Sequence, residues 1–153
     1  MNSNSEIKVY IDGASRNNPG HSGAGVYLVK DETIIVQQGF YLGVKTNNQA
    51  EYLAFLLAIF FALQHMNKSD KLIIISDSQL LVRQISGIYS VKNPELKRMF
   101  DCAIGLLKGY NYQLQHVLRE HNKIADRLAN HGIDKRVPLP KEFHNMWCLD
   151  DKK

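Results

Sequence analysis

Four acidic residues of this chain stand where apolar sequence gives way to a turn or where an apolar helix begins. Asp12 ends the run IKVYID and Asp77 ends the similar run KLIIISD. Glu51 is the only charge at the start of a long apolar stretch, and Asp126 lies early in the last amphipathic one. Carboxylate oxygens are the ligands that hard divalent cations prefer, so the chemistry to consider is metal binding.

Each acid also has a structural explanation. An acid in the first turn of a helix, the position expected for Glu51 and Asp126, stabilises the helix dipole by about 0.3–1 kcal/mol. An aspartate that follows a strand opens a turn or caps a helix. Together, however, the acids are expected to meet at the carboxyl edge of a sheet, where ligands bind. Like charges gathered there repel one another unless a cation neutralises them, and Mg²⁺ fits such a site.

Composition indicates one soluble globular domain, with 153 residues, 44% hydrophobic and 22% charged. A net charge of +4 is mild support for a polyanionic partner. The longest apolar run, residues 52–63, is too short to span a membrane, and MNSNSE does not resemble a signal peptide. We therefore expect a cytoplasmic monomer without a membrane partner, in which Cys102 and Cys148 are thiols.

The elements that must position the acids follow from hydrophobic periodicity. We expect three strands, a helix, a strand, two helices, a strand and a last helix, which is the order of an α/β domain with a mixed sheet. The expected ranges are strand 7–12, a hairpin turning at 30–32, helix 48–66, strand 71–77, helix 78–87, a helix from Pro94, strand 112–118 and a helix over NKIADRLANHGID with Gly132 near its end. Residues 1–136 would form the domain, and residues 137–153 a tail that packs through Phe143 and Trp147.

Four segments resemble type 1 ribonuclease H in their order and approximate spacing. They are YIDGASRNNPGHSGAGVYL, TNNQAEYLAFLLAI, IISDSQLLVRQI and REHNKIADRLAN. The resemblance extends roughly from Ile7 to Asp134, and four motifs in order are specific where any one alone would be weak. It implies the ribonuclease H-like α/β fold, a five-stranded mixed sheet with an N-terminal antiparallel hairpin meander, flanked by helices.

The resemblance also implies an activity, the endonucleolytic hydrolysis of the RNA strand of an RNA/DNA hybrid with 5′-phosphate products. Two Mg²⁺ or Mn²⁺ ions about 4 Å apart would clamp the scissile phosphate, one generating the attacking hydroxide and the other stabilising the leaving 3′ oxygen. Asp12 would bridge both ions, and Asp126 would hold the ion on the nucleophile side. Glu51 and Asp77 would hold the other ion.

Polar residues beside the acids gain a role by the same resemblance. Amides supply both a donor and an acceptor to ribose 2′-hydroxyls, which would be the role of Asn18, Asn47, Asn48 and Gln79. Thr46 matches a family position that contacts a phosphate of the DNA strand. The alternative is that the Asn, Pro and Gly residues of these loops only form turns.

The chain departs from the family pattern in two places. Many members carry a long basic helical protrusion before the last strand, whereas here the interval holds only GIYSVKNPELKRMF. In this short form, we consider as phosphate contacts Arg16, Lys45, Lys92, Lys97 and Arg98. The loop before the last acid is also short, and it leaves Glu120 or His121 as the candidate that assists proton transfer or product release.

Three functions remain open from the sequence. The first is a metal-dependent ribonuclease H that takes an RNA/DNA hybrid as its substrate. The second is a catalytically idle nucleic-acid-binding module on the same fold, which would gain nothing from four acids in a groove for a polyanion. The third is a nuclease of the same superfold that acts on double-stranded RNA or DNA.

Overall fold

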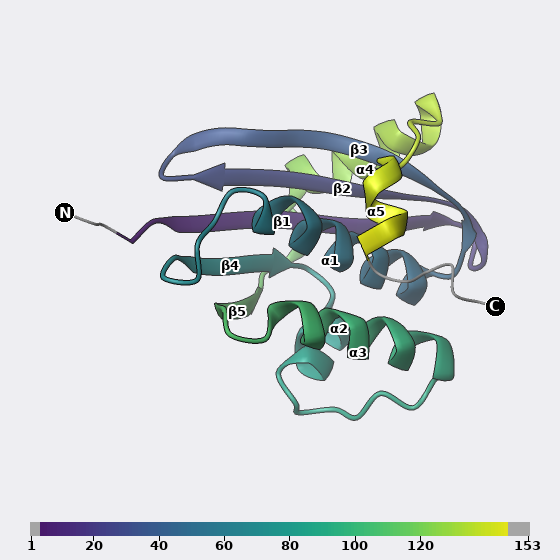
Figure 1. Ribbon diagram of the computed structural model, residues 1–153. Helices are drawn as coiled ribbons and strands as arrows, with labels where there is room; N and C mark the ends of the chain where they lie inside the picture. Colours follow the sequence, from purple (N-terminus) through teal and green to yellow (C-terminus); the bar gives the residue numbers. More distant parts are fainter. Residues whose placement is uncertain (1–3, 147–153) are drawn as a thin grey trace.

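The structure is a computed structural model that describes residues 4–146, and these form a five-stranded sheet with helices on both faces (Figure 1). In chain order the elements are β1 (Glu6–Arg16), β2 (Gly20–Lys30), β3 (Thr33–Lys45), α1 (Asn47–Leu63), β4 (Lys71–Ser76), α2 (Gln79–Ile85), α3 (Pro94–Leu107), β5 (Asn111–His116), the 3₁₀ turn η1 (Arg119–His121), α4 (Lys123–Lys135) and α5 (Lys141–Met146). The strand order in the sheet is β3-β2-β1-β4-β5. The predicted mixed sheet and order of elements are confirmed as far as α4.

The antiparallel half of the sheet is the predicted hairpin meander. β1 pairs with β2, and β2 pairs with β3. Asp31 and Glu32 form the two-residue turn between β2 and β3, with φ of 47° and 72°. Two successive positive φ angles give the turn whose twist matches that of the flanking strands. The other half is parallel, β1 with β4 and β4 with β5, so its connections pass through helices.

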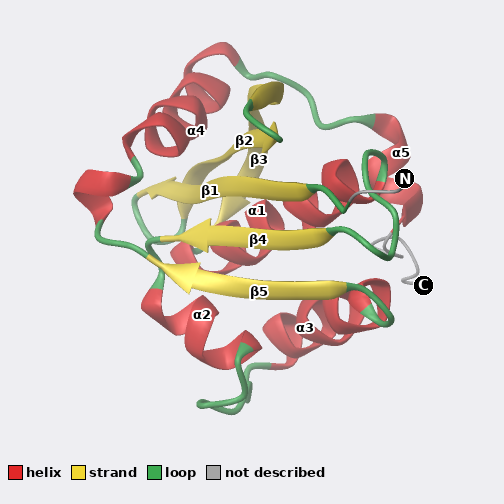
Figure 2. Ribbon diagram, turned by 90° about the vertical axis from the view of Figure 1, so that its left-hand side faces the viewer, coloured by secondary structure: helices red, strands yellow, loops and turns green. Residues whose placement is uncertain are grey.

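α1 covers one face of the sheet and forms the centre of the core. Most of its residues are buried, which explains why its sequence is apolar around nearly the whole circumference. It packs on β1, where Ile7, Val9 and Ile11 are fully buried, and α3 and α5 contact α1 in turn. Figure 2 shows β1, β4 and β5 between α4 on one side and α2 and α3 on the other. Within residues 4–146, no helix has the length and apolar character needed to cross a bilayer.

α4 lies on the opposite face, over β2 and β3, with its backbone against the backbone of the strands. A Cβ atom on Gly25 would lie 2.1 Å from the carbonyl oxygen of Ala125. On Gly39 it would lie 1.8 Å from the carbonyl oxygen of Leu128. Since no side chain fits in these gaps, the glycines of the strands allow α4 to approach the sheet directly.

Gly132 lies near the end of its helix, as predicted, and it belongs to the same close contact. A Cβ atom on this residue would lie 2.4 Å from the backbone nitrogen of Phe40. α4 continues to Lys135, where Arg136 in the left-handed conformation ends it. A glycine is therefore required at position 132 because α4 packs closely against β3 there.

The chain after α4 returns to the core. The backbone N–H of Tyr41 donates to the carbonyl oxygen of Val137 at 2.7 Å, so the edge strand β3 is partly covered. Phe143 of α5 is fully buried and meets Phe60 of α1 edge-on at 5.7 Å between ring centroids. Packing through Phe143 is therefore confirmed, although no periodic pattern predicted the helix. Trp147 lies outside the described residues.

Replacing Gly25 by alanine is expected to lower the free energy of unfolding by roughly 1–3 kcal/mol, because the added methyl group meets the backbone of α4 and no side chain can rotate away. Chemical denaturation measures the change. The matched control is Gly105→Ala in α3, where a Cβ atom meets nothing within 4 Å. That control is expected to be neutral or stabilising by up to about 1 kcal/mol. Equal effects at the two positions would contradict the close approach of α4.

Candidate active site

Asp12 lies inside β1 and not at its end, which corrects the sequence-based prediction. β1 continues to Arg16 because β2 pairs with it along its whole length, whereas β4 pairs with it only as far as Ile11 and Ser76. Asp12 is therefore the first residue of β1 beyond the edge of β4, and Asp77 is the first residue after β4. The two carboxylates meet where the parallel pairing stops, as expected for the carboxyl edge of a sheet.

Glu51 lies in the second turn of α1, since this helix begins one residue earlier than predicted. Thr46 caps it: the Thr46 hydroxyl accepts from the backbone N–H of Gln49 at 3.1 Å, and the Gln49 side chain accepts from the N–H of Thr46 at 2.9 Å. Stabilisation of the helix dipole therefore does not explain this acid. Glu51 Oε1 instead accepts from the backbone N–H of Gly13 at 3.0 Å, which holds its carboxylate beside β1.

The four acids come together in one hollow, which we call the acidic hollow. Carboxylate oxygens of Asp12, Glu51 and Asp77 lie within 4.8 Å of one another. Asp126, in the first turn of α4, lies near Asp12 and contributes to the raised pKa of that residue. The acidic hollow has a volume of about 460 Å³, and all four acids line it. Four elements far apart in the sequence thus supply one cluster of oxygen ligands.

The electrostatics of the acidic hollow favour a cation. Burial, followed by the charges of the neighbouring carboxylates with Glu51 foremost, raises the pKa of Asp12 to about 9. Burial and then the charge of Asp77 raise the pKa of Glu51 to about 8, against the opposing effects of the Gly13 N–H and of Arg119. Carboxylates that resist ionisation because of one another become favourable once a positive ion neutralises them. This set of hard oxygen donors fits a divalent metal ion.

Sequence reasoning missed Asn122, which supports the acidic hollow from behind. Its side chain is buried, and Nδ2 donates to the carbonyl oxygen of Ile11 at 2.8 Å and to Asp77 Oδ2 at 3.2 Å. It therefore ties β1 to the acid that follows β4. An asparagine directly before a helix is expected to cap that helix, but the Asn122 side chain makes no capping hydrogen bond. Its contacts are with residues distant in the sequence, so no local sequence pattern predicts them.

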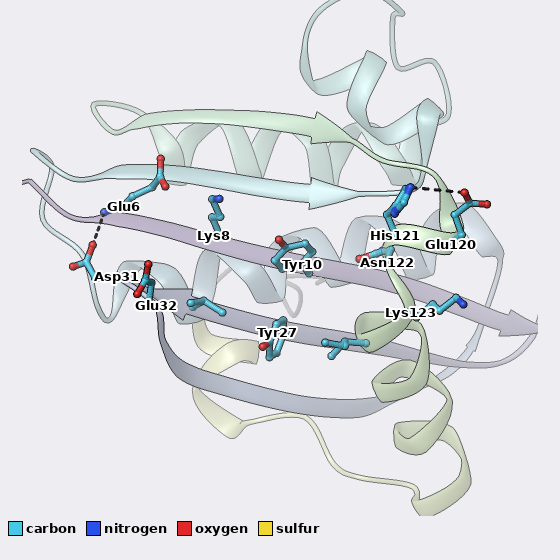
Figure 3. Close-up of a pocket in the computed structure, with 12 residues that line it drawn as sticks. Glu6, Lys8, Tyr10, Tyr27, Asp31, Glu32, Glu120, His121, Asn122 and Lys123 are labelled. Carbon is cyan, nitrogen blue, oxygen red and sulfur yellow. Dashed lines mark hydrogen bonds and ion pairs between the residues drawn. The ribbon is translucent and has the colours of Figure 1, made fainter.

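Arg119 was missed as well. It lines the acidic hollow from η1, and its positive charge lowers the pKa of Glu51. The neighbouring candidates Glu120 and His121 lie elsewhere. They line a second hollow on the open face of β1 and β2, with exposed side chains 3.7 Å apart between His121 Nε2 and Glu120 Oε2 (Figure 3). Of the three residues of η1, the structure brings only the arginine to the acids.

Of the predicted substrate-binding residues, two line the acidic hollow itself. Asn47 and Asn48 line it at the start of α1. The Asn18 side chain accepts from the backbone N–H of Asn47 at 2.9 Å, so it fixes the neighbouring loop. Gln79 is the exposed first residue of α2, two positions after Asp77.

Two of the basic residues considered for phosphate contact are engaged within the protein. Lys97 forms an ion pair with Asp101 at 2.9 Å within α3. Arg16 forms an ion pair with Asp134 at 2.7 Å and donates to Asn130 Oδ1 at 3.0 Å. Asn130 Nδ2 in turn donates to the Asp126 backbone carbonyl at 3.0 Å. Arg16 thus joins the end of β1 to the helix that carries the fourth acid.

Comparison with known proteins agrees with this geometry. Residues 10–132 match the family described as reverse transcriptase-like. The chain is 38% identical over 130 residues to a ribonuclease HI of Halobacterium salinarum, which covers 84% of this chain and 64% of that protein. It therefore spans less than two thirds of the length of that curated relative.

Two solved structures share the fold over nearly their whole length. The crystal structure of RNase H1 from Halobacterium salinarum superposes with a TM-score of 0.79 at 36% identity, covering 85% of this chain and 98% of that one. LC11-RNase H1 in complex with an RNA/DNA hybrid superposes with a TM-score of 0.76 at 34% identity, covering 84% and 97%. With its four acids in one hollow and most of its length matched in this way, the chain belongs to the type 1 ribonuclease H family.

Proposed function

We propose that the protein is an endoribonuclease that hydrolyses the RNA strand of RNA/DNA hybrids and leaves 5′-phosphate ends. The observation that carries the proposal is the convergence of Asp12, Glu51, Asp77 and Asp126 in the acidic hollow. The similar LC11-RNase H1, solved with an RNA/DNA hybrid, supports the choice of substrate. Since all four acids come from one chain, we further propose that a monomer is active, and that it works in the reducing cytoplasm.

The four acids would hold Mg²⁺ or Mn²⁺, with two ions per site. When bound, such ions activate water, neutralise the scissile phosphate and stabilise the leaving oxygen. In the proposed division, Asp12 would contribute to both ion positions, Asp126 would hold the ion on the side of the attacking water, and Glu51 and Asp77 would hold the other. The Gly13 N–H and the Asn122 amide fix the Glu51 and Asp77 carboxylates, so the ligands are oriented before an ion arrives.

Recognition of RNA would fall to the predicted amides. Asn47 and Asn48 begin α1 and line the acidic hollow, and Gln79 begins α2, two residues after Asp77. Amides can pair with ribose 2′-hydroxyls, which DNA lacks. We propose that Asn18 acts by holding the loop of Asn47, and that Thr46 orients this loop as the cap of α1 while it contacts the DNA strand. Glu120 or His121 would assist product release from the neighbouring hollow.

The rival functions are separated by one assay. Labelled RNA/DNA hybrid, double-stranded RNA and double-stranded DNA are each incubated with the protein in Mg²⁺ or in chelator. Cleavage of the hybrid alone, abolished by chelator, is the expected result. Binding without cleavage would identify the idle module, and cleavage of either duplex at a similar rate would identify the broader nuclease.

Asp77→Asn is expected to lower the cleavage rate on the hybrid by roughly a thousandfold or more, because it removes the charge of a metal ligand at almost constant volume. Steady-state kinetics under saturating Mg²⁺ measures the loss. The matched control is Asp101→Asn, the same change at an exposed residue of α3 that pairs with Lys97. The control is expected to cleave like the wild type, and turnover by the Asp77 variant comparable with it would refute the assignment.

The metal-free protein is expected to lose stability as the pH rises. Asp12 and Glu51 take up protons on folding, since their folded pKa values of about 9 and about 8 exceed the ordinary values of 3.8 and 4.5. Between the unfolded pKa values of 3.8 and 4.5 and the folded values of about 9 and about 8, the folded state therefore binds more protons than the unfolded state. The free energy of unfolding falls as the pH rises through this range, until both groups are ionised. Thermal unfolding in chelator across this range measures the fall.

Added Mg²⁺ is expected to reduce that loss of stability, because the ion replaces the protons that leave. Asp77→Asn in chelator should also flatten the pH profile, since it removes a charge that raises both pKa values. A pH profile that is the same with and without Mg²⁺ would mean that the carboxylates do not form a metal site.

The ribose contact is tested by coupling a change in the protein to a change in the substrate. Replacing the 2′-hydroxyl next to the scissile phosphate by hydrogen is expected to slow the wild type sharply. In Gln79→Ala or Asn48→Ala the same replacement should matter less, with a coupling of about 1 kcal/mol for the lost hydrogen bond. Gln113→Ala, at an exposed position of β5, is the control without coupling. An equal deoxy effect in all variants would assign these amides to turn formation alone.

A further inference from the structure

The second hollow, which the proposed reaction leaves largely unused, is larger than the first. It has a volume of about 740 Å³ and lies on the open face of β1 and β2 beside the start of α4. We call it the sheet-face hollow. Figure 3 shows the order of its residues: Asp31 and Glu32 at the hairpin end, Tyr10 and Tyr27 in the middle, and Asn122 at the opposite end.

Asn122 gives this hollow an acceptor that lacks a donor. The residue is only 2% exposed, and both hydrogen bonds that its side chain makes come from Nδ2. Its Oδ1 is buried and accepts from no described residue. Because a buried unpaired acceptor is unfavourable, a ligand whose N–H or O–H group displaces the atoms that cover Oδ1 gains affinity at this end.

Two tyrosines make the floor of the hollow an aromatic platform. Tyr10 and Tyr27 face each other directly across β1 and β2, with ring centroids 5.8 Å apart and ring planes tilted by 47°, so each ring offers its own stacking face. Both rings are partly exposed on the open face of the sheet. Such rings stack on planar heterocycles, and a nucleobase is a ligand of this kind.

The charged residues at the hairpin end of the hollow determine which group the ligand can carry there. Lys8 stands two residues before Tyr10 on the same face, about 7 Å away along the strand, and is exposed. Among the described residues that line the hairpin end it is the only cation, and the acids Glu6, Asp31 and Glu32 lie beyond it. One phosphate group therefore meets a positive charge, whereas a longer phosphate chain would meet the acids.

We propose that the sheet-face hollow binds a nucleoside 5′-monophosphate whose base carries an amino group. The base stacks on one of the two tyrosines and meets the other at its edge, its amino group donates to Asn122 Oδ1, and its phosphate pairs with Lys8. The amino edge and the phosphate are at opposite ends of such a nucleotide, as are Asn122 and Lys8 on either side of the tyrosines. The same chemistry is offered by a free mononucleotide and by the 5′-phosphorylated end of an RNA strand.

Binding of adenosine 5′-monophosphate to the full chain in chelator tests the proposal by calorimetry. Chelator removes metal-dependent binding in the acidic hollow, so failure here leaves the proposed nuclease function untouched. Saturable binding at one site is expected. Purine riboside 5′-monophosphate, which lacks only the amino group, should bind about tenfold more weakly, and adenosine 5′-triphosphate should also bind more weakly than the monophosphate.

Lys8→Met is expected to weaken binding of the monophosphate about tenfold, because it removes the charge and keeps the length of the side chain. Lys108→Met, an exposed lysine directly after α3, is the matched control and should bind like the wild type. Both variants should unfold at the wild-type temperature and cleave the hybrid at the wild-type rate. Amide resonances of Tyr10 and Tyr27 should shift on titration, which places the ligand on β1 and β2.

The two sources of the ligand are distinguished by a short single-stranded RNA with a 5′-phosphate or a 5′-hydroxyl. Tighter binding of the phosphorylated strand than of adenosine 5′-monophosphate identifies an RNA end, and the reverse order identifies a free nucleotide. Absence of saturable binding by both, or equal affinity of Lys8→Met and the wild type, overturns the proposal.

Discussion

The repulsion among four carboxylates is the constraint that the rest of this molecule must overcome. Asp12, Glu51, Asp77 and Asp126 are held close together in a partly buried place, where burial and then the neighbouring charges raise the pKa values of Asp12 and Glu51. The free energy that keeps them together comes from burial elsewhere, chiefly of α1 against β1 and of α4 against β2 and β3. Stability is therefore given up at the site and recovered in the core.

The parts of this arrangement that could be predicted from the sequence are those with a local pattern. The alternation and apolar runs of the strands, the apolar α1 and the hairpin turn at Asp31 and Glu32 all follow from residue types in short windows. The four acids stood out because each interrupted such a pattern. Their meeting at one edge then followed from the parallel order of β1 and β4, without any contact being known.

The parts that could not be predicted depend on contacts between distant segments. β1 runs past Asp12 only because β2 pairs with it there, which nothing in IKVYID indicates. Asn122 was overlooked because its partner Ile11 is far away in the chain, and because its position before a helix has a more common explanation. α5 is short and its buried Phe143 belongs to a helix without periodicity, so only packing against Phe60 reveals it.

The backbone contact of α4 with Gly25 and Gly39 affects how tolerance to substitution is interpreted in this fold. In a complete mutational scan these two positions would reject every other residue, and their profiles would be as restrictive as those of the catalytic acids. Neither glycine lines the acidic hollow. Intolerance to substitution alone would therefore identify two different groups of residues, those that carry out the chemistry and those that leave room for close packing of α4. The acids can be told apart because a change there spares the fold, whereas a side chain at either glycine displaces the helix that carries Asp126.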